Sequence, residues 1–267
     1  MTDAMARRGR PARLPSDAAG NSTAQTVLEL LKALSAQEGP LPLTHLAAAA
    51  GMSASRTHRY LSSLINTGFA RQDATTGHYD IGAATIEIGI AAARRFQGSR
   101  LTDVVMKDLT HSTGLCSYIC VWGSNGPTVI RDEMGEVQTV ARMRMGTNLS
   151  MLTATGQIFL AFMPEAVTRD LLTRDIKTWN AETPERAVTL DDMREQRERV
   201  RKARIARTAG MRNPTWTAFS CPVFDLSGSF RSALTLIGVS VMYDTRLDGT
   251  VAAALKSAAR KMSGGVS

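Results

Sequence analysis

The chain has 267 residues, of which 43% are hydrophobic, and it carries a formal net charge of +8. No apolar run approaches the ~20 residues that cross a bilayer, and no apolar core of a secretory signal stands near the N-terminus, so we expect a soluble protein without membrane segments. Three cysteines, an odd number, argue against a disulfide framework and are typical of a reducing cytoplasm. The positive charge suits a polyanionic partner.

A basic segment precedes the first predicted element. Residues 6–13 read ARRGRPAR, and their Arg-Gly-Arg-Pro core is similar to an AT-hook, in which arginines enter the minor groove of A·T-rich DNA. A basic tail that adds only salt-dependent, non-specific affinity explains the same residues. Under both interpretations residues 1–20 are disordered without DNA and strengthen its binding.

Residues 44–66, THLAAAAGMSASRTHRYLSSLIN, indicate two short helices joined by a glycine turn. We expect Thr44 to cap the first helix, Gly51 to end it in the left-handed conformation and Ser53 to cap the second. Hydroxyls, an imidazole and two guanidinium groups occupy one side of the second helix, where they suit base edges and phosphates. Its other side is a core face at helical spacing, formed by Tyr60, Leu61, Leu64 and Ile65. The pattern is that of a helix-turn-helix, although a solvated helical hairpin would also satisfy it.

The flanking segments favour the helix-turn-helix. An amphipathic helix is predicted over residues 23–34, with apolar positions that would pack across the hairpin. A strand begins near Gly68, residues 73–77 form a turn, and residues 78–81 return as a second strand. Three helices and a hairpin make a winged helix, with Arg71 and His78 on the wing. The apolar positions of the first helix are Val27, Leu28, Leu30, Leu31 and Leu34.

Residues 22–82 resemble the DNA-binding domain of the IclR family of bacterial transcription regulators. Arg56 and Thr57 depart from the family pattern on the predicted reading face, so we expect them to influence which operator sequence is bound. The resemblance rests on Leu43, Leu46, Ala47, Gly51, Met52, Ser55, Arg59, Leu61, Leu64, Gly68 and the wing residues 76–82. The residues expected to contact DNA are Arg7, Arg8, Arg10, Thr44, Ser53, Ser55, Arg56, Thr57, His58, Arg59, Arg71 and His78.

Residues 83–96, AATIEIGIAAARRF, are a predicted helix with more apolar surface than a free linker would carry. In the proteins that this chain resembles, the helix joins two domains and helps to pair the DNA-binding domains of two subunits. The resemblance therefore implies a homodimer or homotetramer. The alternative is a helix buried against its own domain. The expected organisation is a basic tail over 1–20, a winged helix over 21–82, a linker helix over 83–98 and a second domain over 99–267.

The second domain shows a mixed α+β pattern, which is able to enclose a pocket. Residues 153–164 and 221–228 resemble the GAF-like effector domain of the same family. Helices are predicted over residues 101–112, 153–162, 166–172, 191–204 and 247–262. Strands are predicted over residues 116–122, 127–132, 137–142, 219–226 and 232–241, with a hairpin turn at residues 123–126.

The resemblance implies a small-molecule effector, often an organic acid or an aromatic metabolite. A carboxylate is expected at the helix that begins near Thr153, because a helix N-terminus offers free N–H groups. Arg204 stands where the family usually has glycine, and Arg207 where acidic residues are common; both either favour a more anionic effector or point to solvent. The predicted lining of the pocket is Met151, Thr155, Gly156, Ala218, Ser220 and Thr235.

Metal and catalytic sites are not expected. Cys116, Cys120 and His111 offer three soft ligands, but zinc usually takes four, and two cysteines in an apolar strand are more often buried small residues. The chain has no nucleophile elbow, phosphate-binding glycine loop or HExxH sequence. The predicted function is that of a cytoplasmic regulator, without cofactor or enzymatic activity, that binds operator DNA and an effector. The alternative is a sensor or enzyme whose N-terminal module docks to protein.

Overall fold

The computed structural model describes residues 21–96, 100–135, 143–211 and 213–264. The chain divides into two compact units, with the boundary between Ala91 and Ala92. The predicted basic tail and the predicted strand over 137–142 lie outside the described residues. No described helix is long and apolar enough to cross a membrane.

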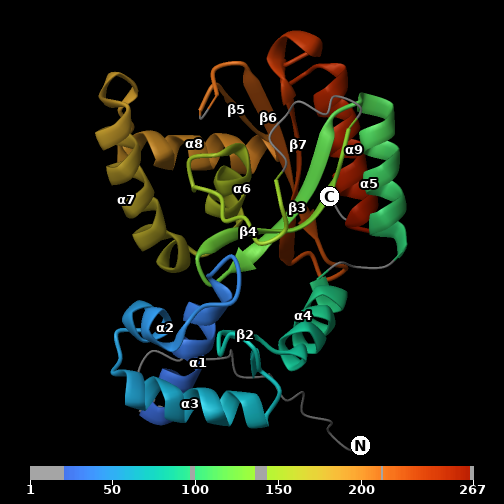
Figure 1. The fold of residues 1–267 in the computed structure, drawn as a ribbon. Helices are drawn as coiled ribbons and strands as arrows, with labels where there is room; N and C mark the ends of the chain where they lie inside the picture. The colour runs from blue at the N-terminus through green and yellow to red at the C-terminus, as the bar shows by residue number, and fades with distance from the viewer. Residues whose placement is uncertain (1–20, 97–99, 136–142, 212, 265–267) are drawn as a thin grey trace, which may run out of the picture. The chain divides into compact units, whose positions relative to one another are not determined.

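The N-terminal unit contains a three-helix core and a two-stranded antiparallel wing, followed by the first part of a fourth helix (Figure 1). Its core is centred on Leu30, Leu46 and Leu61, all fully buried. The winged helix predicted from the sequence is therefore confirmed. The elements are α1 (Ser22–Ser35), α2 (Leu43–Ala49), α3 (Ala54–Asn66), β1 (Ala70–Gln72) and β2 (Tyr79–Ile81).

Two local predictions in this unit are wrong. Helix α2 begins at Leu43, with Pro42 as its N-cap and no side-chain cap bond, so Thr44 lies in the first turn instead of capping it. The proline ring already fixes the φ of the residue that enters the helix. Leu28 is 57% exposed, because α1 buries a narrow stripe in which Leu30 and Leu34 fill the core.

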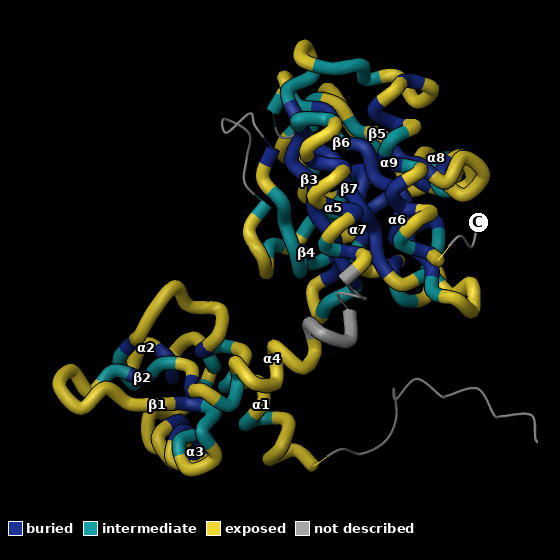
Figure 2. The backbone as a smooth tube through the Cα atoms, turned by 90° about the vertical axis from the view of Figure 1, so that its right-hand side faces the viewer, coloured by how far each residue is buried: buried dark blue, intermediate teal, exposed yellow. Residues whose placement is uncertain are grey.

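Helix α4 (Ala83–Phe96) has the predicted bounds. Its isoleucines do not pack into a core: Ile86, Ile88 and Ile90 are 60%, 57% and 48% exposed. Figure 2 shows the described part of α4 almost entirely in the colour of exposed residues. Burial of these side chains against their own domain is therefore excluded.

The C-terminal unit is built on a five-stranded antiparallel sheet in the order β4-β3-β7-β6-β5. The turn between β3 and β4 lies at Gly123 and Gly126, as predicted. Strand β5 is not predicted by the sequence, because its four residues, ARTA, carry no clear alternation. The strands are β3 (Cys116–Gly123), β4 (Gly126–Glu133), β5 (Ala206–Ala209), β6 (Trp216–Phe224) and β7 (Phe230–Val239).

Helices cover both faces of this sheet (Figure 1). On one face α5 (Arg100–Thr113) and α9 (Thr250–Met262) enclose a core that contains Phe219 and Leu234. On the other face α6 (Ala154–Phe162) and α8 (Leu190–Ala203) enclose a second core. The predicted α+β fold is confirmed.

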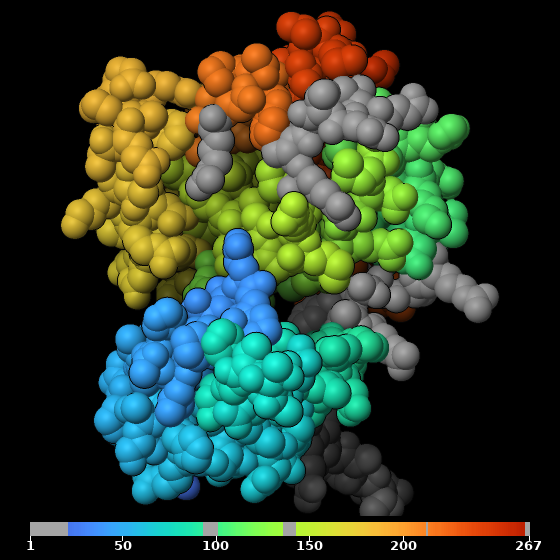
Figure 3. Space-filling model, in the orientation of Figure 1, coloured from blue at the N-terminus to red at the C-terminus, as the bar shows by residue number. Residues whose placement is uncertain are grey.

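Helix α7 (Glu165–Glu182) lies beside α6 and forms a surface ridge of the C-terminal unit in Figure 3. It runs on to Glu182, well past the predicted end at Leu172. Short 3-10 turns complete the unit at Pro184–Arg186 and Ser240–Met242.

Candidate nucleic-acid interface and ligand cavity

Helix α3 is positioned by a turn that uses two special residues. Gly51 has a φ of +62°, in the left-handed region that favours glycine. Ser53 is the N-cap of α3, and its hydroxyl oxygen accepts a hydrogen bond from the Arg56 N–H at 3.4 Å. Both local predictions are confirmed, and α3 begins directly after a sharp change of chain direction.

The exposed face of α3 carries Ser55, Arg56, His58 and Arg59. Thr57 is not part of this face. It is fully buried, and its hydroxyl donates to the Ser53 carbonyl oxygen at 3.0 Å. The expectation that Thr57 contacts DNA is therefore corrected: its side chain belongs to the core face of the helix.

Tyr60 positions two of the exposed cations. The Arg56 Nε–H donates to the Tyr60 hydroxyl at 3.3 Å, and the guanidinium carbons of Arg56 and Arg59 lie 5.5 and 5.4 Å from the ring centroid. The hydrogen bond from Arg56 is the largest cause of a lowered Tyr60 pKa. The sequence assigns Tyr60 to the core alone, although its spacing of four from Arg56 is a signal for such a contact.

The wing is held by polar contacts at its tip. The Asp73 carboxylate accepts from the Thr76 N–H at 2.7 Å, from the Thr76 hydroxyl at 3.0 Å and from the Thr75 N–H at 3.0 Å, and these bonds, the first above all, lower the pKa of Asp73. Arg71 pairs with Asp80 on the neighbouring strand at 2.5 Å. His78 is half-buried and directly precedes the returning strand β2. The charge of Arg71 is thus already partnered, and the wing offers less free positive charge than α3.

The C-terminal unit contains a cavity of about 280 Å³ between the sheet and the segment that leads into α6. Ala218 is one of its lining residues. Apolar walls come from Met143, Leu149, Met211, Trp216 and Ile237. Polar side chains come from Tyr118, Thr147, Asn148, Ser150, Thr153, Thr208 and Asn213. The cavity therefore suits a small ligand that is partly apolar and has one or two polar ends.

A chain of buried hydroxyls lies behind this cavity. The Tyr118 hydroxyl is 3.2 Å from Thr155 Oγ1, which is 2.9 Å from Thr235 Oγ1. Thr235 donates to Ser220 Oγ at 2.8 Å, and Ser220 to the Leu234 carbonyl oxygen at 3.4 Å. Burial raises the pKa of Tyr118, so its hydroxyl stays neutral.

Of the six residues predicted to line the pocket, only Ala218 is among the lining residues of this cavity. Thr155, Ser220 and Thr235 are buried and satisfy one another instead. Gly156 and Met151 are packing residues. A Cβ on Gly156 would lie 2.3 Å from the Ser150 carbonyl oxygen and 2.4 Å from Met151 Cα.

The N-terminus of α6 differs from the expected carboxylate site. Thr153 caps the helix by accepting from the Gly156 N–H at 3.1 Å, and the Ala154 N–H donates to Thr208 Oγ1 at 3.1 Å. Two N–H groups are therefore occupied by hydroxyls of the chain. Thr153 and Thr208 both line the cavity, so this helix end borders the cavity through two residues whose hydroxyls are already hydrogen-bonded within the chain.

The two cysteines and the histidine considered as metal ligands do not form a cluster. Cys116 and Cys120 are buried in β3, whereas His111 is exposed on α5. The Cys116 sulfur accepts from the Gly135 N–H at 3.4 Å, and burial raises the pKa of the Cys120 thiol. Within the described ranges, no group of three or more His, Cys, Asp or Glu residues could hold a metal ion.

Residues 23–74 match the IclR helix-turn-helix domain, and residues 92–264 match the C-terminal domain of the bacterial transcriptional regulator IclR. This chain belongs to the IclR family. The family consists of transcriptional regulators and not of enzymes. The transcriptional repressor IclR of Escherichia coli is 32% identical over 177 residues, which are 63% of this chain and 64% of the repressor. The match thus spans less than two thirds of that relative's length.

Solved IclR-family structures share the fold. An IclR transcriptional regulator from Alicyclobacillus acidocaldarius aligns with a TM-score of 0.73 and 21% identity over 92% of this chain and 99% of its own. An IclR homolog from Microbacterium hydrocarbonoxydans, solved in complex with 4-hydroxybenzoate, aligns with a TM-score of 0.70 and 14% identity over 91% and 98%. Both cover the winged helix and the α+β unit together.

Proposed function

We propose that this IclR-family chain is a cytoplasmic regulator that binds operator DNA through α3 and its wing, and that a small ligand in the C-terminal cavity modulates this binding. The observation that carries the DNA proposal is the exposed face of α3. A capped helix in a winged fold presents Ser55, Arg56, His58 and Arg59 together. These groups match the donors and acceptors of base edges and phosphates.

Arg56 is the strongest candidate for reading a base. Its contact with Tyr60 restricts the guanidinium before DNA arrives, which reduces the entropy lost on binding. An arginine that forms two hydrogen bonds to guanine contributes about 1–3 kcal/mol of discrimination. Ser53 and Thr44 lie near the entrance of the two helices and would contact phosphates. The exposed isoleucines of α4 support a homodimer or homotetramer, which would match a two-fold operator.

The test is a binding titration of the full chain against the DNA upstream of its own gene, followed by fluorescence anisotropy. We expect Arg56→Ala to raise the Kd for operator DNA about tenfold or more and to reduce the discrimination between bases at one position of the operator. Lys32→Ala is the matched control, because it removes an exposed cation from α1, outside the proposed surface. Lys32→Ala should leave affinity and preference unchanged.

Two results would contradict the DNA proposal. If the Arg56→Ala protein binds operator DNA with the affinity and base preference of the wild type, Arg56 does not read a base. A wild-type protein without sequence-dependent, salt-sensitive binding would favour a sensor whose N-terminal module docks to protein. Arg7, Arg8 and Arg10 lie outside the described residues, and their contribution stays a prediction. Deletion of residues 1–20 should weaken affinity and reduce its dependence on salt.

The proposed effector is a small organic acid with an apolar or aromatic body. The walls of the cavity supply Trp216 and two methionines, and Tyr118, Thr153 and Thr208 supply hydroxyls. The complex of the Microbacterium hydrocarbonoxydans homolog with 4-hydroxybenzoate supports an aromatic acid as the first probe.

The ligand is tested by the shift of the melting temperature across a panel of organic acids that includes 4-hydroxybenzoate. We expect Tyr118→Phe to reduce the shift produced by a binding acid, because Tyr118 lines the cavity and its hydroxyl joins the cavity wall to the buried hydroxyls of Thr155 and Thr235. Tyr243→Phe is the control: its hydroxyl donates to the Thr217 carbonyl oxygen, outside the cavity lining. If no acid raises the melting temperature, the cavity is structural and the effector proposal fails.

A further inference from the structure

A second cavity of about 280 Å³ lies in the C-terminal unit, where the C-terminal end of α8 meets β6 and α9. It shares no lining residue with the proposed effector cavity. Its charged lining residues are Arg204, Lys256 and Arg260, and its apolar wall includes Pro222 and Phe224. The sequence leaves open where Arg204 points; in the structure it lines this second cavity and not the first.

The charge of this cavity is unbalanced. Its lining contains three cations and no carboxylate, and none of the three forms an ion pair with a described residue. Lys256 and Arg260 are four residues apart on α9, so they share one helix face, where like charges destabilise the helix. An anion between them would relieve this repulsion.

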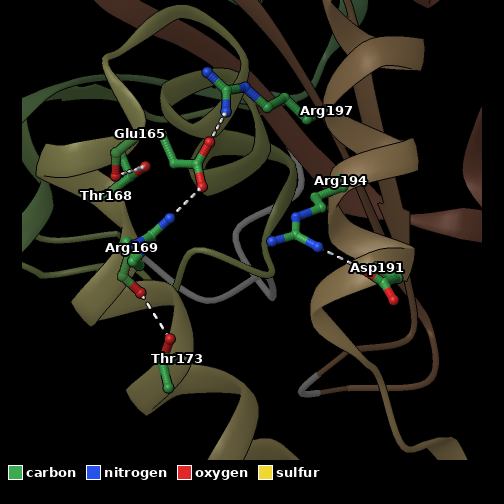
Figure 4. A network of polar contacts seen from close by, with 7 residues as sticks. All are labelled: Glu165, Thr168, Arg169, Thr173, Asp191, Arg194 and Arg197. Atoms are coloured by element: carbon green, nitrogen blue, oxygen red, sulfur yellow. Dashed lines mark hydrogen bonds and ion pairs between the residues drawn. The ribbon is translucent and has the colours of Figure 1, made fainter.

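The arginine cluster between α7 and α8 provides a contrast (Figure 4). There Glu165 pairs with Arg169 at 3.1 Å and with Arg197 at 3.2 Å, and Asp191 pairs with Arg194 at 2.7 Å. Each guanidinium therefore has a carboxylate of the chain itself. Among the residues that the structure describes, no carboxylate compensates the cations of the cavity at Arg204 in this way.

Arg204 also occupies an unfavourable backbone conformation. Its φ of +53° closes α8 in the left-handed region, and among the described residues it is the single non-glycine with a positive φ. Glycine would end the helix without this strain. The guanidinium carbon lies 4.8 Å from the centroid of the Phe224 ring, which holds the side chain at the cavity. Helix termination alone does not explain an arginine here.

We propose that this cavity binds a small polyanion, with a phosphate group or paired carboxylates, as a ligand separate from the effector. The planar guanidinium groups of Arg204 and Arg260 can each donate hydrogen bonds to two oxygens of one anion, and Lys256 adds a third positive charge. The cavity volume of about 280 Å³ suits a small molecule more than a nucleic-acid backbone. The proposal does not depend on the ligand of the first cavity.

The test uses the full chain and inorganic pyrophosphate as the probe, with sodium chloride of equal ionic strength as the reference. Calorimetric titration and melting temperature are measured for the wild type, Arg204→Gly, Lys256→Gln and Arg260→Gln. We expect saturable pyrophosphate binding by the wild type and at least a fivefold increase in Kd for each variant. Arg204→Gly relieves the left-handed strain, so it should keep its melting temperature without pyrophosphate while losing the response to it.

Two control variants separate this cavity from other sites. Lys202→Gln removes an exposed cation of α8 that does not line the cavity, and Tyr118→Phe alters the first cavity. Both should bind pyrophosphate with the Kd of the wild type. A melting shift no larger than that of the chloride reference would overturn the proposal, as would equal loss of affinity in Lys202→Gln and Arg204→Gly.

Other occupants give different results. If a chain that ends at Gly264 binds pyrophosphate more tightly than the full chain, residues 265–267 compete for the cavity and the proposal of a free ligand is overturned. If Arg204→Gly weakens binding to non-operator duplex DNA as strongly as it weakens pyrophosphate binding, the cations form a DNA-contacting surface instead.

Discussion

At the scale of single residues, Gly156 shows how a glycine can be required by packing without an unusual φ. It lies in the first turn of α6, where the helix backs onto the segment that precedes it. The nearest atoms that an added Cβ would meet are backbone atoms of Ser150 and Met151, at 2.3 and 2.4 Å. Backbone cannot rotate away as a side chain can, so the helix end itself would have to move.

We therefore predict that Gly156→Ala lowers the free energy of unfolding by about 3 kcal/mol, as expected for overpacking against a rigid neighbour. Gly89→Ala is the matched control, because a Cβ on Gly89 in α4 meets nothing within 4 Å. Alanine in an exposed helix interior should gain about 0.5–1 kcal/mol over glycine. Urea unfolding followed by far-ultraviolet circular dichroism measures both. A Gly156→Ala protein as stable as the wild type would disprove the contact.

The sequence predicts single residues well where their role is local. The turn at Gly51 and the cap at Ser53 depend on a few neighbouring residues, and both are confirmed. The burial of Thr57 could have been predicted from helical spacing. Thr57 lies three residues before Tyr60 and four before Leu61, so it shares their buried helix face. The hydroxyl pairing of Ser220 and Thr235 depends on strand register, which residue types alone do not define.

At the scale of elements, α7 and α8 are joined by charged side chains. Arg197 is 16% exposed and reaches from α8 to Glu165 on α7, and Arg201 donates to the Ala161 carbonyl oxygen at the end of α6 at 2.9 Å. The sequence predicts α8 but not that its arginines contact neighbouring helices. It also misses most of α7, because the residues after Leu172 are largely polar. The helical period of a sequence shows which face of a helix is apolar, but it does not show which long side chains reach a neighbouring helix.

Glu165 makes the α7–α8 contact sensitive to pH. The hydrogen bond from Arg169 is the largest cause of its lowered pKa, and Arg197 contributes further. A carboxyl whose pKa is lower in the folded state stabilises the fold above its unfolded pKa of about 4.3, and this contribution is lost as the pH falls through the folded value. Glu165→Gln should therefore lower the melting temperature at pH 7, and the deficit should shrink progressively as the pH falls below about 4.3.

Glu195→Gln is the control for this prediction, because it removes an exposed carboxylate of α8 for which the described residues provide no ion pair. It should change the melting temperature little at either pH. Scanning calorimetry from pH 3 to pH 7 measures the difference between each variant and the wild type. A Glu165→Gln deficit that is the same at pH 3 and pH 7 would show that the carboxylate charge is not responsible.

At the scale of the whole molecule, the alternation of patterns along the chain is enough to predict two folds in order. Short amphipathic helices and a small hairpin precede a mixed series of strands and helices, and the two units match this division. The candidate sites are less predictable. The cavity gathers Tyr118, Thr208 and Trp216 from separate strands, and the sequence contains no spacing that brings them together.

The proposed function places DNA contacts and ligand contacts in different units, so it requires energetic coupling between them. If the ligand changes the Kd for DNA by a given factor, DNA must change the Kd for the ligand by the same factor. We predict that saturating ligand changes the Kd for operator DNA by a factor of about five or more, which is within the usual range of allosteric coupling. Anisotropy titrations of operator DNA with and without ligand give one ratio, and calorimetric titrations of ligand with and without operator give the other.

Two variants separate coupling from binding. Arg56→Ala should weaken DNA binding and leave the ligand Kd of the DNA-free protein unchanged, because Arg56 belongs to the N-terminal unit. Tyr118→Phe should keep the DNA affinity of the ligand-free protein and lose most of the ligand effect at a fixed ligand concentration. Since a ligand shifts an equilibrium only by its difference in affinity for the two states, a measured factor of one would mean that the cavity does not control DNA binding, however tightly the ligand binds.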